Sequence, residues 1–95
     1  MRVIIAPHAG VDLERLREFL AERNPTASER ASRAILDRLN LLSQFPALGK
    51  PLGGTGLREL YVPFGKSAYV IRYSRSRTHN ALIVLRIWHA REQRR

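Results

Sequence analysis

The chain has 95 residues, of which 44% are hydrophobic, enough for the core of one domain and too few for two. Its formal net charge of +9 at pH 7 predicts an acidic partner, either a nucleic acid or an acidic protein segment. The sequence contains no cysteine, which excludes disulfides and thiolate metal sites, and no apolar run reaches the roughly 20 residues that span a bilayer. We therefore expect a single domain over residues 1–95, with the cytoplasm as its default compartment.

The positive charge is concentrated in the second half of the chain. Residues 1–50 contain 8 basic and 6 acidic side chains, whereas residues 51–95 contain 9 basic and 2 acidic ones. Nearly all the basic residues are arginine, whose planar guanidinium suits two-point contacts with phosphate or carboxylate groups. A GC-rich genome also favours arginine over lysine without functional gain, but it does not explain the asymmetry between the two halves.

The first predicted elements are a short strand and a helix. Residues 2–7 combine β-branched side chains with a closing proline, which predicts a strand. Asp12 is a residue type that caps helix N-termini, so we expect the first helix to begin there. Leucines recur at helical spacing behind it: Leu13, Leu16 and Leu20. The dipeptide Asn24-Pro25 is expected to end this helix.

A second predicted helix follows almost at once. Asn24 is expected to cap it, and Pro25 fits the first turn, where no backbone N–H is needed. One apolar stripe runs along it: Ala31, Ile35, Leu39 and Leu42. Because the link between the helices is so short, they should form an antiparallel hairpin, which Phe45-Pro46 closes. The glycine- and proline-rich residues 46–56 are expected to form a loop.

The rest of the chain predicts a sheet. Three strand-like runs occupy residues 57–62, 68–73 and 81–87, and the polar residues 74–80 are expected to form the turn between the last two. The predicted order of elements is then β-α-α-β-β-β. An α+β fold, in which the two-helix hairpin packs on one face of a small, mostly antiparallel sheet, would bury both apolar stripes.

Motifs for a metal or a nucleotide are weak or absent in the sequence. The histidines lie in three different segments, and no pair has the spacing of a metal site: His8, His79 and His89. The glycine-rich residues 53–56 precede a strand, whereas nucleotide loops lie between a strand and a helix N-terminus. We therefore expect no metal and no cofactor.

Three arginines inside the predicted strands make the sheet the candidate functional surface: Arg58, Arg72 and Arg86. Strict alternation along the last strand places four side chains on one face: Leu82, Val84, Arg86 and Trp88. Since the helices can cover only one face of the sheet, we expect the other face to present the three arginines in a row near Trp88. The alternative is that each arginine lies at the edge of the sheet and pairs with a carboxylate.

A groove of this kind has two uses that residue types alone do not separate. It would bind RNA, with the arginines stabilising the charge of a phosphorane-like transition state and His89 moving a proton near neutral pH. It would equally bind an acidic or extended peptide laid along the sheet.

Five stretches that cover nearly the whole chain form a recognisable pattern. They are DLERLREFLAERNPTASERA, LLSQFPALGKPL, GLRELYV, YVIRY and IVLRIWHARE. The combination of FPxLGK, LREL, YxIxY and a strand that ends in HxR is more specific than any single piece. Taken together, these stretches resemble the ParE/RelE superfamily of bacterial toxins, and within it the ParE branch.

The resemblance implies the toxin of a type II toxin–antitoxin system, neutralised by a ParD-like antitoxin whose extended C-terminal part wraps around it. ParE-like toxins of such plasmid-stabilising systems inhibit DNA gyrase, block replication and arrest growth. The toxin would then be a protein-binding inhibitor and not an enzyme. RelE-like relatives are instead ribosome-dependent, metal-independent mRNA endonucleases, and this is the alternative function for the chain.

The resemblance also implies residue roles by position. For a nuclease, the catalytic residues would be Arg58, Arg86, His89 and Arg91. For either branch, the groove for the antitoxin or the target would comprise Arg58, Arg72, Arg86, Trp88, His89 and Arg91. No tyrosine follows Trp88, and the loop before Leu57 contributes only Lys50 as a basic residue, so part of the usual nuclease set is missing. This departure favours the ParE branch, for which no catalytic residues are expected.

Overall fold

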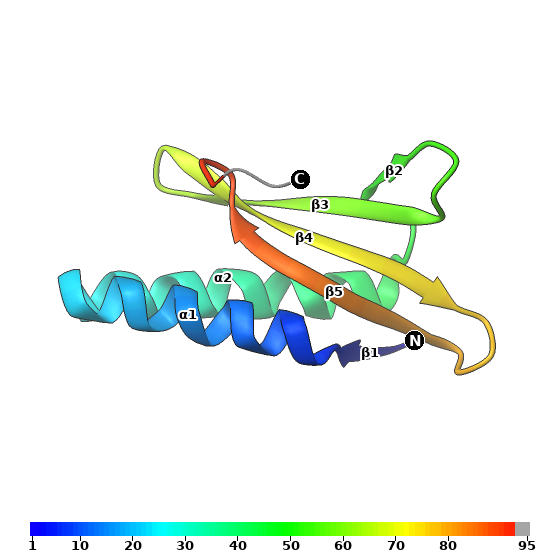
Figure 1. The fold of residues 1–95 in the computed structure, drawn as a ribbon, viewed down its shortest axis with the longest axis horizontal. Helices are drawn as coiled ribbons and strands as arrows, with labels where there is room; N and C mark the ends of the chain where they lie inside the picture. The colour runs from blue at the N-terminus through cyan, green and yellow to red at the C-terminus, as the bar shows by residue number, and fades with distance from the viewer. Residues whose placement is uncertain (93–95) are drawn as a thin grey trace.

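The computed structural model of the chain describes residues 1–92 as two helices packed against one face of a five-stranded sheet (Figure 1). In chain order, the elements are β1 (Arg2–Ile5), α1 (Pro7–Arg23), α2 (Pro25–Gln44), β2 (Lys50–Leu52), β3 (Leu57–Phe64), β4 (Ser67–Ser76) and β5 (Ala81–His89). This arrangement confirms the predicted α+β fold with a helical hairpin on a small sheet. Within the described part of the chain, neither helix is long and apolar enough to cross a membrane.

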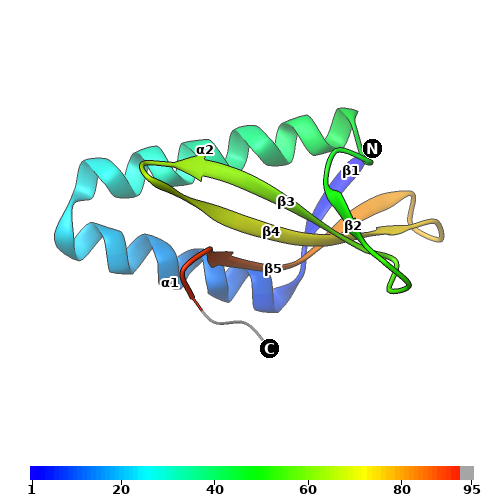
Figure 2. The same ribbon diagram turned by 90° about the horizontal axis from the view of Figure 1, so that it is seen from above.

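The strands lie in the order β1-β5-β4-β3-β2; β1 pairs parallel with β5, and the other pairings are antiparallel. Seen from above, α1 runs along the β5 side of the sheet and α2 along the β3 side (Figure 2). The short strand β2 lies in a segment that the sequence predicted to be entirely loop. Its three residues are defined as a strand only by their pairing with the start of β3, and they carry no periodic pattern of their own.

Helix α1 begins at Pro7, well before the predicted start at Asp12. Proline fits the first helical position, because the N–H that it lacks would have no partner there. Ala6 occupies the N-cap position without a side-chain hydrogen bond, so no capping residue marks the boundary. Asp12 lies in the second turn and is only 3% exposed. The prediction that Asp12 caps the helix was wrong, because its carboxylate bonds instead to groups of strand β5.

Helix α2 begins where the sequence predicted. The side chain of Asn24 accepts a hydrogen bond from the N–H of Ala27 at 3.1 Å, and Pro25 occupies the first turn. The predicted stripe is buried in the core: Ala31, Ile35, Leu39 and Leu42. The helix ends at Gln44, immediately before the predicted stop, so the helical hairpin is confirmed.

A β-bulge in strand β5 reverses the facing of its side chains. Arg72 pairs with Arg86, and the next residue of β4 pairs with Val84, so Leu85 has no partner on β4. The core contains both Val84 and Ile87, which strict alternation would place on opposite faces. The prediction that Arg86 shares a face with Val84 was therefore wrong.

The hydrophobic core lies between the helical hairpin and the sheet. Rows of side chains cross the opposite face, which we call the open face, from β3 through β4 to β5, and two of these rows contain predicted site residues. One row is Glu59, Arg72 and Arg86, and the next is Tyr61, Val70 and Trp88. Both helices lie on the other side of the sheet (Figure 1), so these two rows are where a surface of the predicted kind would have to form.

Candidate functional site

Arg72 lies in the middle of the open face, where the neighbouring strand balances its charge. Its Nε and Nη2 atoms donate to Glu59 Oε2 at 2.9 and 2.6 Å, and Glu59 lies directly across from it on β3. The guanidinium also stacks on the indole ring of Trp88, 4.9 Å from the ring centroid. These contacts hold Arg72 close to the sheet and leave little of its charge for an external ligand.

Arg86 reaches from the open face to the buried Asp12 of α1. Its Nε and Nη2 atoms donate to the two carboxylate oxygens at 2.8 and 3.0 Å, which is the bidentate geometry of a strong ion pair. This hydrogen bond raises the pKa of Arg86 above its ordinary value, although burial acts in the opposite direction. Arg86 therefore fastens strand β5 to helix α1.

Asp12 also completes the hydrogen bonding of the sheet edge. Strand β1 pairs with β5 only as far as Ile5 and Val84, so the later N–H groups of β5 that point away from β4 have no strand beside them. The N–H of Ile87 donates to Asp12 Oδ2 at 2.9 Å. Since a buried N–H without a partner is costly, this bond gives a physical reason for a carboxylate between helix and sheet.

Arg58 lies on the helix side of the sheet, away from the other two arginines. Its partner across the strands is Tyr73, a core residue, so both side chains share the helix-facing side. Arg58 Nη1 donates to two carbonyl oxygens of the loop at residues 46–49, at 2.6 and 3.2 Å. The predicted row of three arginines on one face was therefore wrong. For Arg72 and Arg86, the alternative of pairing with a carboxylate is confirmed.

Tyr73 fastens the loop that follows α2. Its hydroxyl donates to the carbonyl oxygen of Pro46 and accepts from the N–H of Gly49, both at 2.8 Å. A Cβ at Gly49 would lie 2.6 Å from the Tyr73 ring, so glycine is required for this approach. Burial raises the pKa of the Tyr73 hydroxyl, opposed by the Gly49 hydrogen bond and the charge of Arg58. Sequence reasoning missed this contact, because nothing local indicates which ring the glycine must meet.

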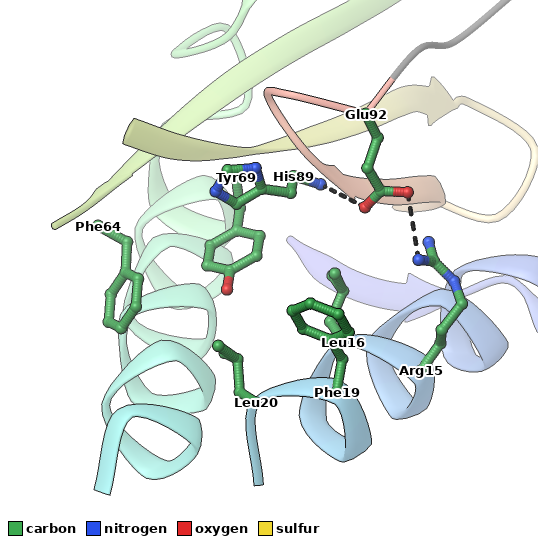
Figure 3. Close-up of a pocket in the computed structure, with 8 residues that line it drawn as sticks. All are labelled: Arg15, Leu16, Phe19, Leu20, Phe64, Tyr69, His89 and Glu92. Atoms are coloured by element: carbon green, nitrogen blue, oxygen red, sulfur yellow. Dashed lines mark hydrogen bonds and ion pairs between the residues drawn. The ribbon is translucent and has the colours of Figure 1, made fainter. Parts of the chain in front are cut away.

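An apolar cleft of about 460 Å³ opens at the other end of the sheet (Figure 3). It is lined by Arg15, Leu16, Phe19, Leu20, Phe64, Tyr69, His89 and Glu92. The hydroxyl of Tyr69 points into the cleft; burial, and secondarily the charge of Glu92, raises the pKa of Tyr69. Sequence reasoning singled out only His89 among these residues, because the cleft forms where α1 meets the ends of three strands.

A turn at the end of β5 positions His89 beside the cleft. The His89 N–H donates to Glu92 Oε1 at 3.0 Å, and Glu92 Oε2 pairs with Arg15 of α1 at 3.2 Å (Figure 3). The imidazole Nδ1 accepts from the N–H of Arg91 at 3.2 Å. The ring also packs edge-on against Tyr69, with the two centroids 5.3 Å apart. His89 is therefore part of the wall of the cleft.

The structure does not bring the four candidate nuclease residues to one point. Arg58 and His89 lie beside β4 residues that are four positions apart, or about 13 Å along a strand. Arg86 is on the opposite face, and Arg91 is exposed next to His89. The six predicted groove residues are likewise divided between the two faces of the sheet. Within residues 1–92, no group of three or more His, Asp or Glu side chains is placed to hold a metal ion.

The sequence matches the family model of the ParE toxin of the type II toxin–antitoxin system parDE over residues 3–94. The chain belongs to this toxin family. The toxin is 40% identical over 92 residues to Toxin RelE1 of Caulobacter vibrioides, which covers 97% of this chain and 96% of the relative. Toxin RelE3 of the same bacterium is 40% identical over 93 residues, 97% of both chains. The predicted membership of the ParE/RelE superfamily is confirmed, and the chain is a type II toxin of that superfamily.

Two solved structures share the fold of this toxin. The chromosomal ParDE toxin–antitoxin system of P. aeruginosa gives a TM-score of 0.76 at 18% identity, covering 94% of this chain and 95% of that one. The toxin–antitoxin complex RelBE2 of Mycobacterium tuberculosis gives a TM-score of 0.62 at 24% identity, covering 93% and 95%. At these identities the likeness establishes the fold alone. The relatives carry names from both branches of the superfamily, so similarity does not assign the toxin to one of them.

Proposed function

We propose that this toxin inhibits DNA gyrase, in the manner expected of the ParE branch, and that a ParD-like antitoxin neutralises it in the cytoplasm. The observation that supports this most is the separation of the candidate nuclease residues. Cleavage of RNA needs a proton-transferring group and cations within hydrogen-bond reach of one phosphate. His89 and Arg58 lie at opposite ends of the sheet, and Arg86 is paired with Asp12. The toxin is then a protein-binding inhibitor and not an enzyme.

Cleavage of ribosome-bound mRNA is the second candidate function. The names of the two Caulobacter relatives, RelE1 and RelE3, favour it. His89 and Arg91 are the two members of the candidate catalytic set that lie side by side, at the end of β5. A nuclease built on this chain would therefore use the end of β5 for proton transfer, without help from Arg58.

The proposed antitoxin site is the apolar cleft, with His89 in its wall and Arg91 beside it. A partner segment that carries apolar and acidic side chains would complement an open apolar cleft on a chain of net charge +9. Both structural relatives are toxin–antitoxin assemblies, which supports a partner of this class for the present toxin.

Pulse-labelling of bacteria just after induction of the toxin without antitoxin separates the two functions. We expect DNA synthesis to fall before protein synthesis. The double variant His89→Ala/Arg91→Ala should arrest growth as strongly as the wild type, because a protein-binding inhibitor needs no proton-transferring group at the end of β5. Lys66→Ala, in the exposed β3–β4 turn, is the matched control.

An early fall in protein synthesis that the double variant abolishes would overturn the gyrase proposal in favour of the nuclease. Arg86→Ala is a poorer choice for this experiment. It would remove the bidentate partner of the buried Asp12 carboxylate, so a loss of toxicity would be explained by unfolding.

A further inference from the structure

The three arginines of the sheet differ in what balances their charge. Arg72 binds the carboxylate of Glu59, and Arg86 binds that of Asp12. Arg58 donates only to carbonyl oxygens, and no carboxylate of residues 1–92 forms an ion pair with it. Carbonyl oxygens satisfy donor hydrogens but carry no full negative charge. Arg58 is therefore a half-buried cation that no carboxylate of the described residues neutralises, which makes it a candidate for binding an external anion.

Arg58 lines a small pocket of about 140 Å³ at the end of the sheet away from the apolar cleft. The lining residues are Pro46, Ala47, Gly56, Arg58, Tyr73, Ser74 and Arg75. Arg75 shares the helix-facing side with Arg58, because their partners across the strands, Leu82 and Tyr73, both belong to the core. Two cations thus converge on the pocket, and none of its lining residues is acidic.

We propose that this pocket binds the carboxylate of an aspartate or glutamate side chain of the antitoxin, an inference that rests on the antitoxin proposed above. The two carbonyl bonds of Nη1 hold the Arg58 guanidinium in place before a ligand arrives, which lowers the entropy cost of binding. Its Nε and Nη2 groups remain as donors for a planar carboxylate. The pocket is smaller than the roughly 300 Å³ at which small-molecule sites begin, and this suits the tip of one side chain.

The surroundings of the pocket favour a protein partner over a nucleic acid. Pro46 and Ala47 line the pocket, and their neighbours Phe45 and Leu48 are 57% and 41% exposed. Apolar contacts around a single charged anchor are typical of protein interfaces. A nucleic-acid backbone is instead bound by cations spread along a groove, one for each phosphate. Here the two arginines line one small pocket, which fits one acidic side chain.

NMR spectroscopy of arginine side chains tests the pocket with a defined probe, N-acetylglutamate N-methylamide, which carries one carboxylate. The Nε–Hε signals of Arg58 and Arg75 should shift saturably as the probe is added. Arg75→Ala should weaken binding by about fivefold, because one charge-assisted contact is lost. Arg77→Ala is the matched control, since it removes the same charge from the exposed β4–β5 turn outside the pocket.

Three results of this titration would overturn the proposal. The first is the absence of any saturable shift at Arg58, and the second is equal weakening of probe binding by the two variants. The third concerns inorganic phosphate, titrated in parallel. If phosphate saturates the pocket and the carboxylate probe does not, the pocket serves a phosphate group and the partner is not an acidic side chain.

The same variants in complex with the antitoxin separate this inference from the proposed function. The antitoxin that co-purifies with tagged toxin should dissociate from Arg75→Ala about tenfold faster than from the wild type, and from Arg77→Ala at nearly the wild-type rate. Equal dissociation from all three proteins would refute the carboxylate pocket and leave the proposed function intact. If the wild-type toxin binds no antitoxin, the partner itself is wrong and the inference falls with it.

Discussion

Tyr69 and Tyr73 stand four residues apart on strand β4, share one face and are almost completely buried, yet the two ends of the sheet around them differ. At the Tyr73 end, the loop at residues 46–49 closes over the ring and takes both hydrogen bonds of the hydroxyl. At the Tyr69 end, the hydroxyl points into a cleft of about 460 Å³ that the described chain leaves open (Figure 3). The same face of one strand is thus sealed at one end and open at the other.

This difference indicates that the Tyr73 hydroxyl stabilises the fold, whereas the cleft beside Tyr69 is available to a partner. At the sealed end the hydroxyl of Tyr73 completes its hydrogen bonds within the chain, so Tyr73 itself contributes chiefly to folding, whereas recognition at that end is proposed for Arg58 and Arg75. The open end keeps apolar side chains in contact with solvent, including Phe19, which is 53% exposed. Burial of that area by a partner would stabilise a complex and adds little to the isolated fold. Substitutions of Tyr73 and of Phe19 should therefore affect different measurements, stability for Tyr73 and antitoxin binding for Phe19.

The largest expected effect concerns the contact between α1 and strand β5; α1 also supplies one wall of the cleft at the open end. Asp12→Asn removes the carboxylate that binds Arg86 and the N–H of Ile87. We expect the free energy of unfolding, measured with urea, to fall by about 3 kcal/mol. Glu14→Gln, which breaks only the exposed pair with Arg17, should change it by less than about 0.5 kcal/mol. Similar small losses in both variants would mean that apolar packing alone holds α1.

The next effect should appear in binding and not in stability. Phe19→Asp places a charge in the apolar cleft, and we expect the affinity for the antitoxin to fall about 30-fold, or roughly 2 kcal/mol. Val11→Asp is the control, because Val11 is 67% exposed on the same helix but does not line the cleft. Thermal denaturation should give similar Tm values for both variants. An unchanged antitoxin affinity of Phe19→Asp would remove the cleft from the interface.

The smallest effect compares the two tyrosines directly. Tyr73→Phe loses two hydrogen bonds to the loop at residues 46–49 and should lower the free energy of unfolding by about 1 kcal/mol at pH 7. Tyr69→Phe removes a hydroxyl that faces the cleft and should cost less than about 0.5 kcal/mol. Chemical denaturation of the two variants under identical conditions measures this difference. Equal losses of stability in the two variants would show that the hydrogen bonds between Tyr73 and the loop add nothing to the stability of the fold.

The pH dependence of the free energy of unfolding gives a second test of Tyr69 and Tyr73. Burial raises the pKa of both tyrosines above the value of about 10 that holds in the unfolded chain. Above that pH the unfolded state loses the phenolic protons first, so the stability of the folded toxin should decrease as pH rises from about 10 toward the raised values. Each Phe variant should lose less stability than the wild type over this range, since one such group is gone.

Much of the fold could be predicted because its signals are local. The proline and asparagine at the helix junction, the apolar period of α2 and the β-branched runs of the last three strands all specify structure within a few residues. The start of α1 escaped prediction, since Ala6 offers no capping side chain and Asp12 is the more usual marker. Strand β2 escaped because a three-residue strand is defined only by its partner.

The candidate site was less predictable, for a reason visible in strand β5. Alternation along a strand is reliable only while the register is regular. The bulge at Leu85 leaves Arg86 and Trp88 on the open face, as predicted, but puts Leu82 and Val84, which alternation grouped with them, in the core. The position of that bulge depends on pairing with β4, which no pattern within β5 reveals. Arg58 was likewise assigned to the same face as Arg72, although the strand pairing places them on opposite faces.

The sequence by itself determined the class of fold, the helical hairpin and the toxin family, because these depend on local preferences and on motifs spread along the whole chain. Only the tertiary structure decided which charges are balanced internally. Asp12 meets Arg86 across 74 positions of sequence, whereas Arg58 is left with carbonyl oxygens. Such pairings depend on where helices and strands meet in space. The sequence shows that a side chain is charged, but it does not show which partner lies beside that charge.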